Sequence, residues 1–180
     1  IPENGPVAMA DISDLKMTIV TNDPTKRYYY TLLFDDKYRV KIATRNINIP
    51  GVQNFRDLGG YPSYSTKKQM RWGMIYRSAE IDSLECSSRR ELKNLGIKTL
   101  IDLRASSEIG RQSPLQKGFN VVHIPLATGD MEGILKGIRE EKIKSDTVYR
   151  MVERMNRVLI DQYTKEYRQI FDILLDKNSY

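Results

Sequence analysis

The apolar residues among the first fifty positions cluster in short runs that are rich in β-branched and aromatic side chains. Three strands are predicted there, at residues 14–20, 26–34 and 38–44. The polar break at Asp35–Lys37 suits a hairpin turn between the last two strands. We interpret this β-rich segment as part of a β-domain or as an extension that packs on the following residues, with residues 48–52 as the joint.

After residue 50 the pattern changes to an alternation of helices and apolar strands. The segment 87–96 is predicted to be a short helix, because Leu92 and Leu95 lie on one face and Gly96 stands where a helix ends. Three strands are predicted around this helix, at residues 70–78, 97–103 and 119–126. A helix followed by a buried strand is typical of α/β proteins.

The last part of the chain is predicted to be helical. From Ser145 onward apolar residues recur at three-four spacing, which indicates one long helix or two helices with a bend, with the methionines in the core. Residues 131–141 form a weaker helix candidate, because two glycines lower its propensity. The predicted fold is α/β, with a central sheet flanked by helices over residues 50–180 and the small β-rich segment before it, over residues 1–49.

Composition and charge narrow the classes of function. Lys and Arg number 29 against 23 Asp and Glu, a net charge of +6, and both signs are mixed along the chain. This distribution indicates a solvated surface, and no zinc-finger, RNP or basic-arm pattern is present, so we expect no nucleic-acid partner. No run of about 18 apolar residues occurs, so no transmembrane segment is expected. The chain begins at Ile1 without a signal-peptide pattern, and we expect that its front has been trimmed or processed, which leaves both a cytoplasmic and an exported location open.

The chain has one cysteine, Cys86, and one histidine, His123. A single cysteine cannot form an internal disulfide, and a Cys/His metal cluster is excluded, so no zinc site is expected. Cys86 fits an ordinary residue at a helix start or in a loop. His123 fits a hydrogen-bonded, partly buried residue better than a catalytic base.

Charged residues gather where the predicted strands end. The stretches concerned are "NFRDLGGY" (54–61), "YRSAE" (76–80), "IDLRASSE" (101–108) and "HIPL" (123–126). Ligands of α/β sheets bind at the carboxyl ends of the strands, and an arginine fork suits a phosphate or carboxylate group. The candidate site residues from these stretches are Arg56, Asp57, Arg77, Asp102, Arg104 and Glu108.

Each candidate also has a purely structural interpretation. Asp57 can accept backbone N–H bonds in the turn formed by Gly59 and Gly60. Asp102 and Arg104 flank a leucine in the strand, so both point away from the face that the leucine buries and can pair with their neighbours.

Cys86 does not begin a phosphate-binding loop. A cysteine nucleophile in such a loop requires an arginine six positions later, so that backbone N–H groups and the guanidinium surround one phosphoryl group while the thiolate attacks it. Leu92 stands at that position, and the arginines at 89 and 90 come too early.

Taken together, "NFRDLGGY", "RWGMIYRSAEIDSL", "LKNLGIKTLIDLRASSE", "HIPL" and the long helix resemble the bacterial tyrosine-phosphatase family of cysteine-dependent enzymes. The resemblance runs from about residue 50 to the end, and it implies a cysteine-phosphatase-like sheet. In that family a His-Cys-x-x-Gly-Lys-Asp-Arg-Thr-Gly loop supplies the nucleophile, the clamping arginine and the proposed general acid. This loop is expected beyond Tyr180, so the 180-residue chain alone is predicted to be inactive.

The resemblance also implies roles for individual residues. Arg56 and Asp57 would border the pocket, and Arg77 and Ser78 would shape its rim. Asp102 and Arg104 would support the loop or the substrate, with Glu108 as a looser match. The family chemistry needs no metal or other cofactor, because loop N–H groups and the arginine neutralise the phosphoryl charge.

The first functional hypothesis is therefore a hydrolase of phosphate monoesters. Its substrates would be phosphotyrosine in a protein or, in addition, phosphoserine, phosphothreonine or phosphoinositide, processed through a phosphocysteine intermediate. An alternative is a non-catalytic module that binds phosphorylated or acidic ligands through Arg56, Arg77 and Arg104.

Overall fold

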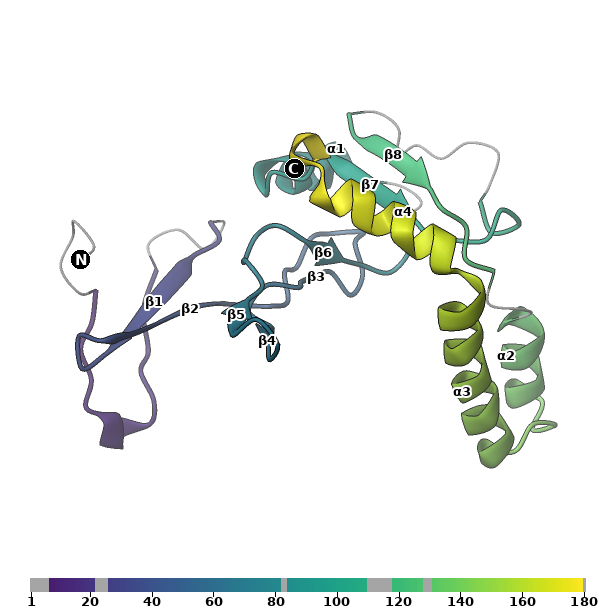
Figure 1. Ribbon diagram of the computed structural model, residues 1–180, viewed down its shortest axis with the longest axis horizontal. Helices are drawn as coiled ribbons and strands as arrows, with labels where there is room; N and C mark the ends of the chain where they lie inside the picture. Colours follow the sequence, from purple (N-terminus) through teal and green to yellow (C-terminus); the bar gives the residue numbers. More distant parts are fainter. Residues whose placement is uncertain (1–6, 22–25, 82–83, 110–117, 128–130, 180) are drawn as a thin grey trace. The chain divides into compact units, whose positions relative to one another are not determined.

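The computed structural model describes residues 7–21, 26–81, 84–109, 118–127 and 131–179, which are coloured in Figure 1. The chain divides into two compact units, residues 1–44 and 45–180. The predicted joint at residues 48–52 lies instead inside the second unit. Ile49 and Val52 are each 5% exposed there, and Pro50 and Gly51 form a tight turn between them, with Gly51 at a φ of 74°.

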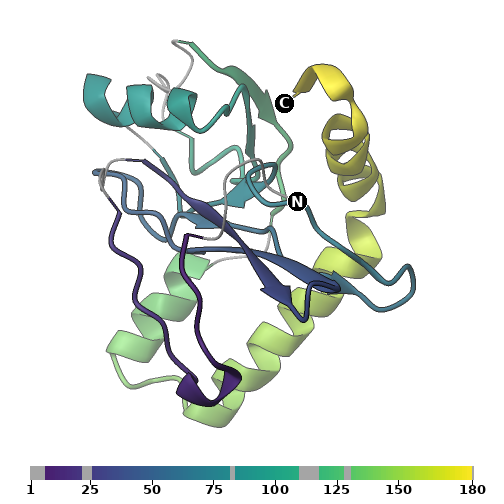
Figure 2. The same ribbon diagram turned by 90° about the vertical axis from the view of Figure 1, so that its left-hand side faces the viewer.

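The first unit is built on a β-hairpin, as predicted. Strands β1 (Tyr29–Phe34) and β2 (Tyr38–Ala43) pair antiparallel and lie side by side in Figure 2. Tyr30, Leu32 and Phe34 lie opposite Ile42, Val40 and Tyr38 in register, so one face of the hairpin is apolar.

The strand predicted at residues 14–20 does not form. The short 3-10 helix η1 (Ile12–Asp14) occupies its start, and Asp11 caps this helix by accepting the Ser13 N–H. Leu15 then takes a left-handed conformation with a φ of 52°, which ends the helix and interrupts any extended run. Local capping therefore overrides the β propensity of the following residues.

The second unit begins with short antiparallel pairs. Strand β3 (Arg56–Asp57) pairs with β6 (Tyr76–Arg77), and β4 (Pro62–Ser63) pairs with β5 (Lys68–Gln69). The strand predicted at residues 70–78 is therefore reduced to two residues, because a turn at Trp72 and Gly73 interrupts it. Gly73 has a φ of 78°, a value that suits glycine and breaks an extended strand.

Helix α1 (Cys86–Asn94) is followed by the parallel strands β7 (Thr99–Asp102) and β8 (Asn120–His123), as the sequence predicts. Gly96 ends the helix with a φ of 80°, and the N–H groups of Gly96 and Ile97 bond the carbonyls of Lys93 and Leu92. These elements confirm the α/β fold class.

The predicted tail forms helices α2 (Met131–Arg139), α3 (Ser145–Gln162) and α4 (Thr164–Leu175), followed by the 3-10 helix η3 (Lys177–Ser179). Tyr163, with φ and ψ of −108° and 28°, separates α3 from α4, and the change of direction is visible in Figure 1. The Tyr163 hydroxyl donates to the Ala127 carbonyl at 2.8 Å, which ties this bend to the segment after β8. Two helices with a bend therefore form, one of the two predicted outcomes.

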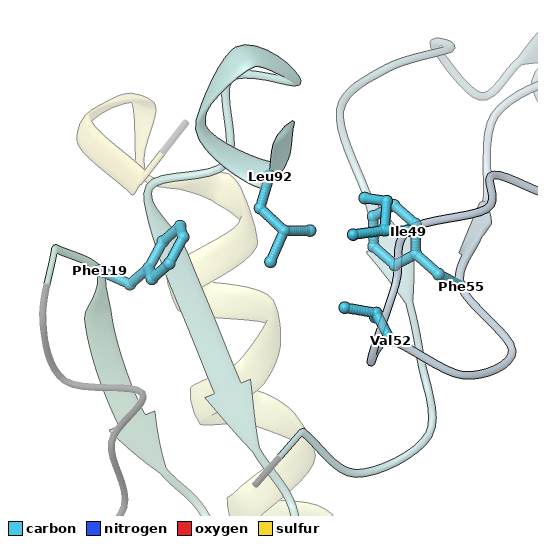
Figure 3. Close-up of a cluster of buried hydrophobic side chains, with 5 residues drawn as sticks. All are labelled: Ile49, Val52, Phe55, Leu92 and Phe119. Atoms are coloured by element: carbon cyan, nitrogen blue, oxygen red, sulfur yellow. The ribbon is translucent and has the colours of Figure 1, made fainter. Parts of the chain in front are cut away.

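The core of the second unit joins its N-terminal segment to the α/β part. Leu92 of α1 is fully buried and points between Phe119, just before β8, and the cluster of Ile49, Val52 and Phe55 (Figure 3). The β3–β6 pair, which carries Arg56, Asp57 and Arg77, is anchored to this core, because Phe55 precedes β3 directly.

Replacing Leu92 by alanine is expected to lower the free energy of unfolding by about 2–5 kcal/mol, because it leaves a cavity at a fully buried position. Urea denaturation followed by circular dichroism measures the change. Leu175→Ala is the matched control, since this side chain is 78% exposed at the end of α4, and a shift within about 0.5 kcal/mol is expected for it. Equal losses in both variants would contradict the assignment of Leu92 to the core.

Candidate functional site

The carboxylate of Asp57 lies inside the protein and joins two turns. Asp57 is fully buried, with an exposed fraction of 0%. Its Oδ1 accepts the Gly59 N–H at 2.7 Å, and its Oδ2 accepts the Gly73 N–H at 2.8 Å. A buried carboxylate is stabilised by such backbone donors. This geometry agrees with the structural interpretation of Asp57 as an acceptor in the Gly-Gly turn.

The packing of Trp72 explains why positions 59 and 60 are both glycine. A Cβ added to Gly59 would lie 2.4 Å from the Trp72 Cα, and one added to Gly60 would lie 2.3 Å from a carbon of the indole ring. Gly60 also has a φ of 80°, which disfavours other residues. The backbone and the indole therefore pack at a separation that no side chain on either glycine would permit.

Arg45 closes the other side of this turn. Its guanidinium carbon lies 4.1 Å from the centre of the Tyr61 ring and 5.2 Å from that of Trp72, and its Nη1 donates to the Asp57 carbonyl at 2.8 Å. The charged guanidinium group of Arg45 therefore makes cation–π and hydrogen-bond contacts within the fold. The sequence analysis missed both Arg45 and Trp72, although the single tryptophan of the chain was a signal that could have been weighed.

Arg56 and Arg77 come together on the β3–β6 pair. They are register partners, so their side chains leave the same face, whereas Asp57 and Tyr76 leave the other. Arg56 is partly buried and Arg77 is exposed. Ser78, which follows β6, is partly buried.

Asp102 and Arg104 form a second group, at the carboxyl end of β7. The Nε of Arg104 donates to both carboxylate oxygens of Asp102, at 3.0 and 3.1 Å, and its Nη2 donates to Oδ2 at 2.8 Å. The side chains are only 14% and 13% exposed. A forked, shielded pair of this kind fixes the orientation of the guanidinium.

The surroundings of Arg104 join three of the four predicted stretches. Its Nη1 lies 3.8 Å from the Oε2 of Glu80, which follows the "YRS" motif, and its carbonyl accepts the Nε2 proton of His123 from β8 at 2.8 Å. The sequence analysis did not select Glu80, although it lies two residues after Ser78. Glu108 instead caps its own turn, accepting the Ala105 N–H at 2.6 Å.

The ionisation of Asp102 follows from this environment. Burial alone raises the pKa of its carboxyl group, but the hydrogen bonds from Arg104, the charge of Arg104 and that of His123 outweigh it, so the pKa lies below the ordinary value of 3.8. Asp102 is therefore a carboxylate at neutral pH, where it holds Arg104 in place.

The described parts of the chain contain no cluster of three or more His, Cys, Asp or Glu side chains suited to a metal ion. Within those same parts, every helix is too short or too polar to span a lipid bilayer. Cys86 is exposed and is the first residue of α1. Leu92, six positions later, is buried in the core, so no guanidinium faces Cys86 from that position.

Comparison with known proteins gives two findings. Residues 47–180 match the model of a tyrosine phosphatase family. A segment of 79 residues, which is 43% of this chain, is 38% identical to the triple specificity protein phosphatase PtpB of Mycobacterium tuberculosis (strain ATCC 25618 / H37Rv). The matched segment spans 27% of the length of that relative.

Asp57→Ala is expected to lower the free energy of unfolding by at least about 2 kcal/mol, because the buried N–H groups of Gly59 and Gly73 would lose their acceptor. Urea denaturation measures the loss. Asp172→Ala, at an exposed position of α4, is the control and is expected to stay within about 0.5 kcal/mol of the unmodified chain. An equally small effect at Asp57 would show that the two turns hold together without the carboxylate.

The stability that Asp102 contributes is expected to depend on pH. Because its folded-state pKa is depressed, the contribution is fully present above 3.8 and is lost as the pH falls from there through the folded-state pKa. The difference in unfolding free energy between the unmodified chain and Asp102→Asn should therefore be largest at neutral pH and shrink in acid. Urea titrations on both sides of that pH range test this, and a difference that does not vary with pH would contradict it.

Proposed function

Because the chain belongs to the tyrosine phosphatase family, we propose that the protein hydrolyses phosphate monoesters through a phosphocysteine intermediate. The family match over residues 47–180 is the observation that carries the proposal. Phosphotyrosine in a protein is the first substrate to test. Phosphoserine, phosphothreonine and phosphoinositides are further members of the same chemical class.

In the proposed reaction a cysteine thiolate attacks the phosphorus atom and forms an S–P bond, while the bond from phosphorus to the ester oxygen breaks. An acid protonates the leaving oxygen, and water then attacks the phosphocysteine, releasing inorganic phosphate and restoring the thiolate. Cys86 does not suit the role of nucleophile, because the buried Leu92 stands where the clamping arginine is required. We therefore assign the nucleophile to a segment outside these 180 residues.

The charged groups of this chain would have supporting roles. Asp102 would hold Arg104 at the carboxyl end of β7, where the guanidinium helps to position the catalytic loop or the substrate. Arg56 and Arg77 would supply positive charge for an anionic substrate from the β3–β6 pair. Asp57, being buried and saturated by backbone donors, would shape this rim without touching the substrate.

An assay with p-nitrophenyl phosphate tests the proposal. The full-length gene product is expected to release p-nitrophenol, whereas the 180-residue chain is expected to show no turnover above background. Arg104→Gln in the full-length protein should lower kcat/KM at least about ten-fold, the loss expected for one charge-assisted contact.

Arg157→Gln serves as the control, because Arg157 is an exposed residue of α3 that pairs with Glu153, and its kcat/KM is expected to be unchanged. Turnover by the 180-residue chain would contradict the assignment of the nucleophile. A full-length protein that binds phosphopeptides without hydrolysing them would contradict the proposed activity and support the non-catalytic alternative.

A further inference from the structure

Two arginines face one another across the β3–β6 pair. Arg56 and Arg77 are antiparallel register partners, so their Cβ atoms are about 5 Å apart on one face. The next partners, Asp57 and Tyr76, leave the opposite face, where Asp57 is fully buried and the Tyr76 ring stacks on Phe55 with ring centres 5.2 Å apart. The arginine pair is therefore on the face turned away from the core.

The positive charges of this pair are not compensated within the described parts of the chain. No ion pair there involves Arg56 or Arg77, and the Nε of Arg56 is buried without a hydrogen-bond acceptor. Like charges directly opposite one another destabilise a strand pair, and a buried donor without an acceptor costs further free energy. An anion between the two side chains would relieve both unfavourable contributions.

Two carboxylates near Arg56 and Arg77 along the chain, those of Asp57 and Glu80, have other partners. Asp57 accepts the N–H groups of Gly59 and Gly73. Glu80, which follows β6, lies against Arg104. Neither is therefore a ready counter-ion for the two guanidinium groups.

We infer that Arg56 and Arg77 together form a binding site for a phosphate dianion. Two guanidinium groups match a charge of minus two, whereas one carboxylate would neutralise only one of them. Each guanidinium offers parallel N–H donors that fit phosphate oxygens, and a phosphate oxygen would provide the acceptor that the Arg56 Nε lacks. Inorganic phosphate and a phosphate monoester share these oxygens, so either can be the source.

This inference rests on the proposed function for its choice of ligand, and it extends that function by assigning phosphate binding to residues of this chain, separately from the catalytic loop. The site would hold the product phosphate or a phosphate group of the substrate. Binding can be measured without turnover.

The test is an NMR titration of the ¹⁵N-labelled 180-residue chain at constant ionic strength. Inorganic phosphate, O-phosphotyrosine and chloride are added in separate series, and the Nε–Hε resonance of Arg56, assigned by its loss in Arg56→Lys, is followed. A saturable shift is expected with a phosphate species and not with chloride. Arg77→Gln should weaken binding at least about ten-fold, because one charge-assisted contact is lost.

Arg90→Gln is the matched control, an exposed arginine on α1, and it should leave the affinity unchanged. Tighter binding of phosphotyrosine than of inorganic phosphate would identify an ester as the ligand, and the reverse would identify free phosphate. Equal affinity in Arg77→Gln and the unmodified chain, or the same shift with chloride, would overturn the inference. Because Arg77 is exposed, Arg77→Gln tests the site even if Arg56→Lys fails to fold: the phosphate-dependent shifts of the whole spectrum are then compared between this variant and the unmodified chain, without assignment of the Arg56 resonance.

The two proposals can fail separately. Phosphate binding by this chain together with an inactive full-length protein would overturn the proposed function alone. Turnover by the full-length protein without phosphate binding at Arg56 and Arg77 would overturn only the inference about this pair.

Discussion

The part of the candidate site on β3 and β6 depends on one buried group, the Asp57 carboxylate. Its two oxygens bind the backbone N–H groups of Gly59 and Gly73, which belong to turns on different parts of the chain. A carboxylate with no access to water must keep both acceptors occupied, so the two turns are held at a fixed separation. β3 and β6, whose outer face carries Arg56 and Arg77, lie next to these turns along the chain.

Four arginines in and around the candidate site fall into two classes. Arg45 and Arg104 make contacts within the fold. Arg45 packs against two aromatic rings and donates to a backbone carbonyl, and Arg104 donates several hydrogen bonds to the Asp102 carboxylate. Within the described residues, no ion pair involves the guanidinium groups of Arg56 and Arg77, and the Arg56 Nε has no hydrogen-bond acceptor. Under the proposed function, an anionic substrate would be bound by guanidinium groups of the second kind, while those of the first kind would hold the surrounding backbone and side chains in place.

The elements that the sequence predicted well are those whose signal is local. Helix α1 has its apolar face and its terminal Gly96 within ten residues, and β7 and β8 are short apolar runs. The strand predicted at residues 70–78 was wrong over most of its length, because the turn at Gly73 is stabilised by Asp57, 16 positions away along the chain. Charged residues at strand ends could be selected from the sequence, because their positions follow from the local strand pattern. The contact of Glu80 with Arg104 could not be predicted, because it depends on how separate segments of the chain pack.

The position of Trp72 has an optical consequence. It is the only tryptophan of the chain, and its indole ring covers the Gly59–Gly60 turn with the Arg45 guanidinium 5.2 Å from the ring centre. The tryptophan fluorescence of this chain, excited selectively above the tyrosine absorption, therefore originates from one turn and not from an average over many sites. A change in emission wavelength on denaturation or ligand addition would report the exposure of that turn to water, and a helical probe such as far-ultraviolet dichroism would follow the remainder of the chain independently.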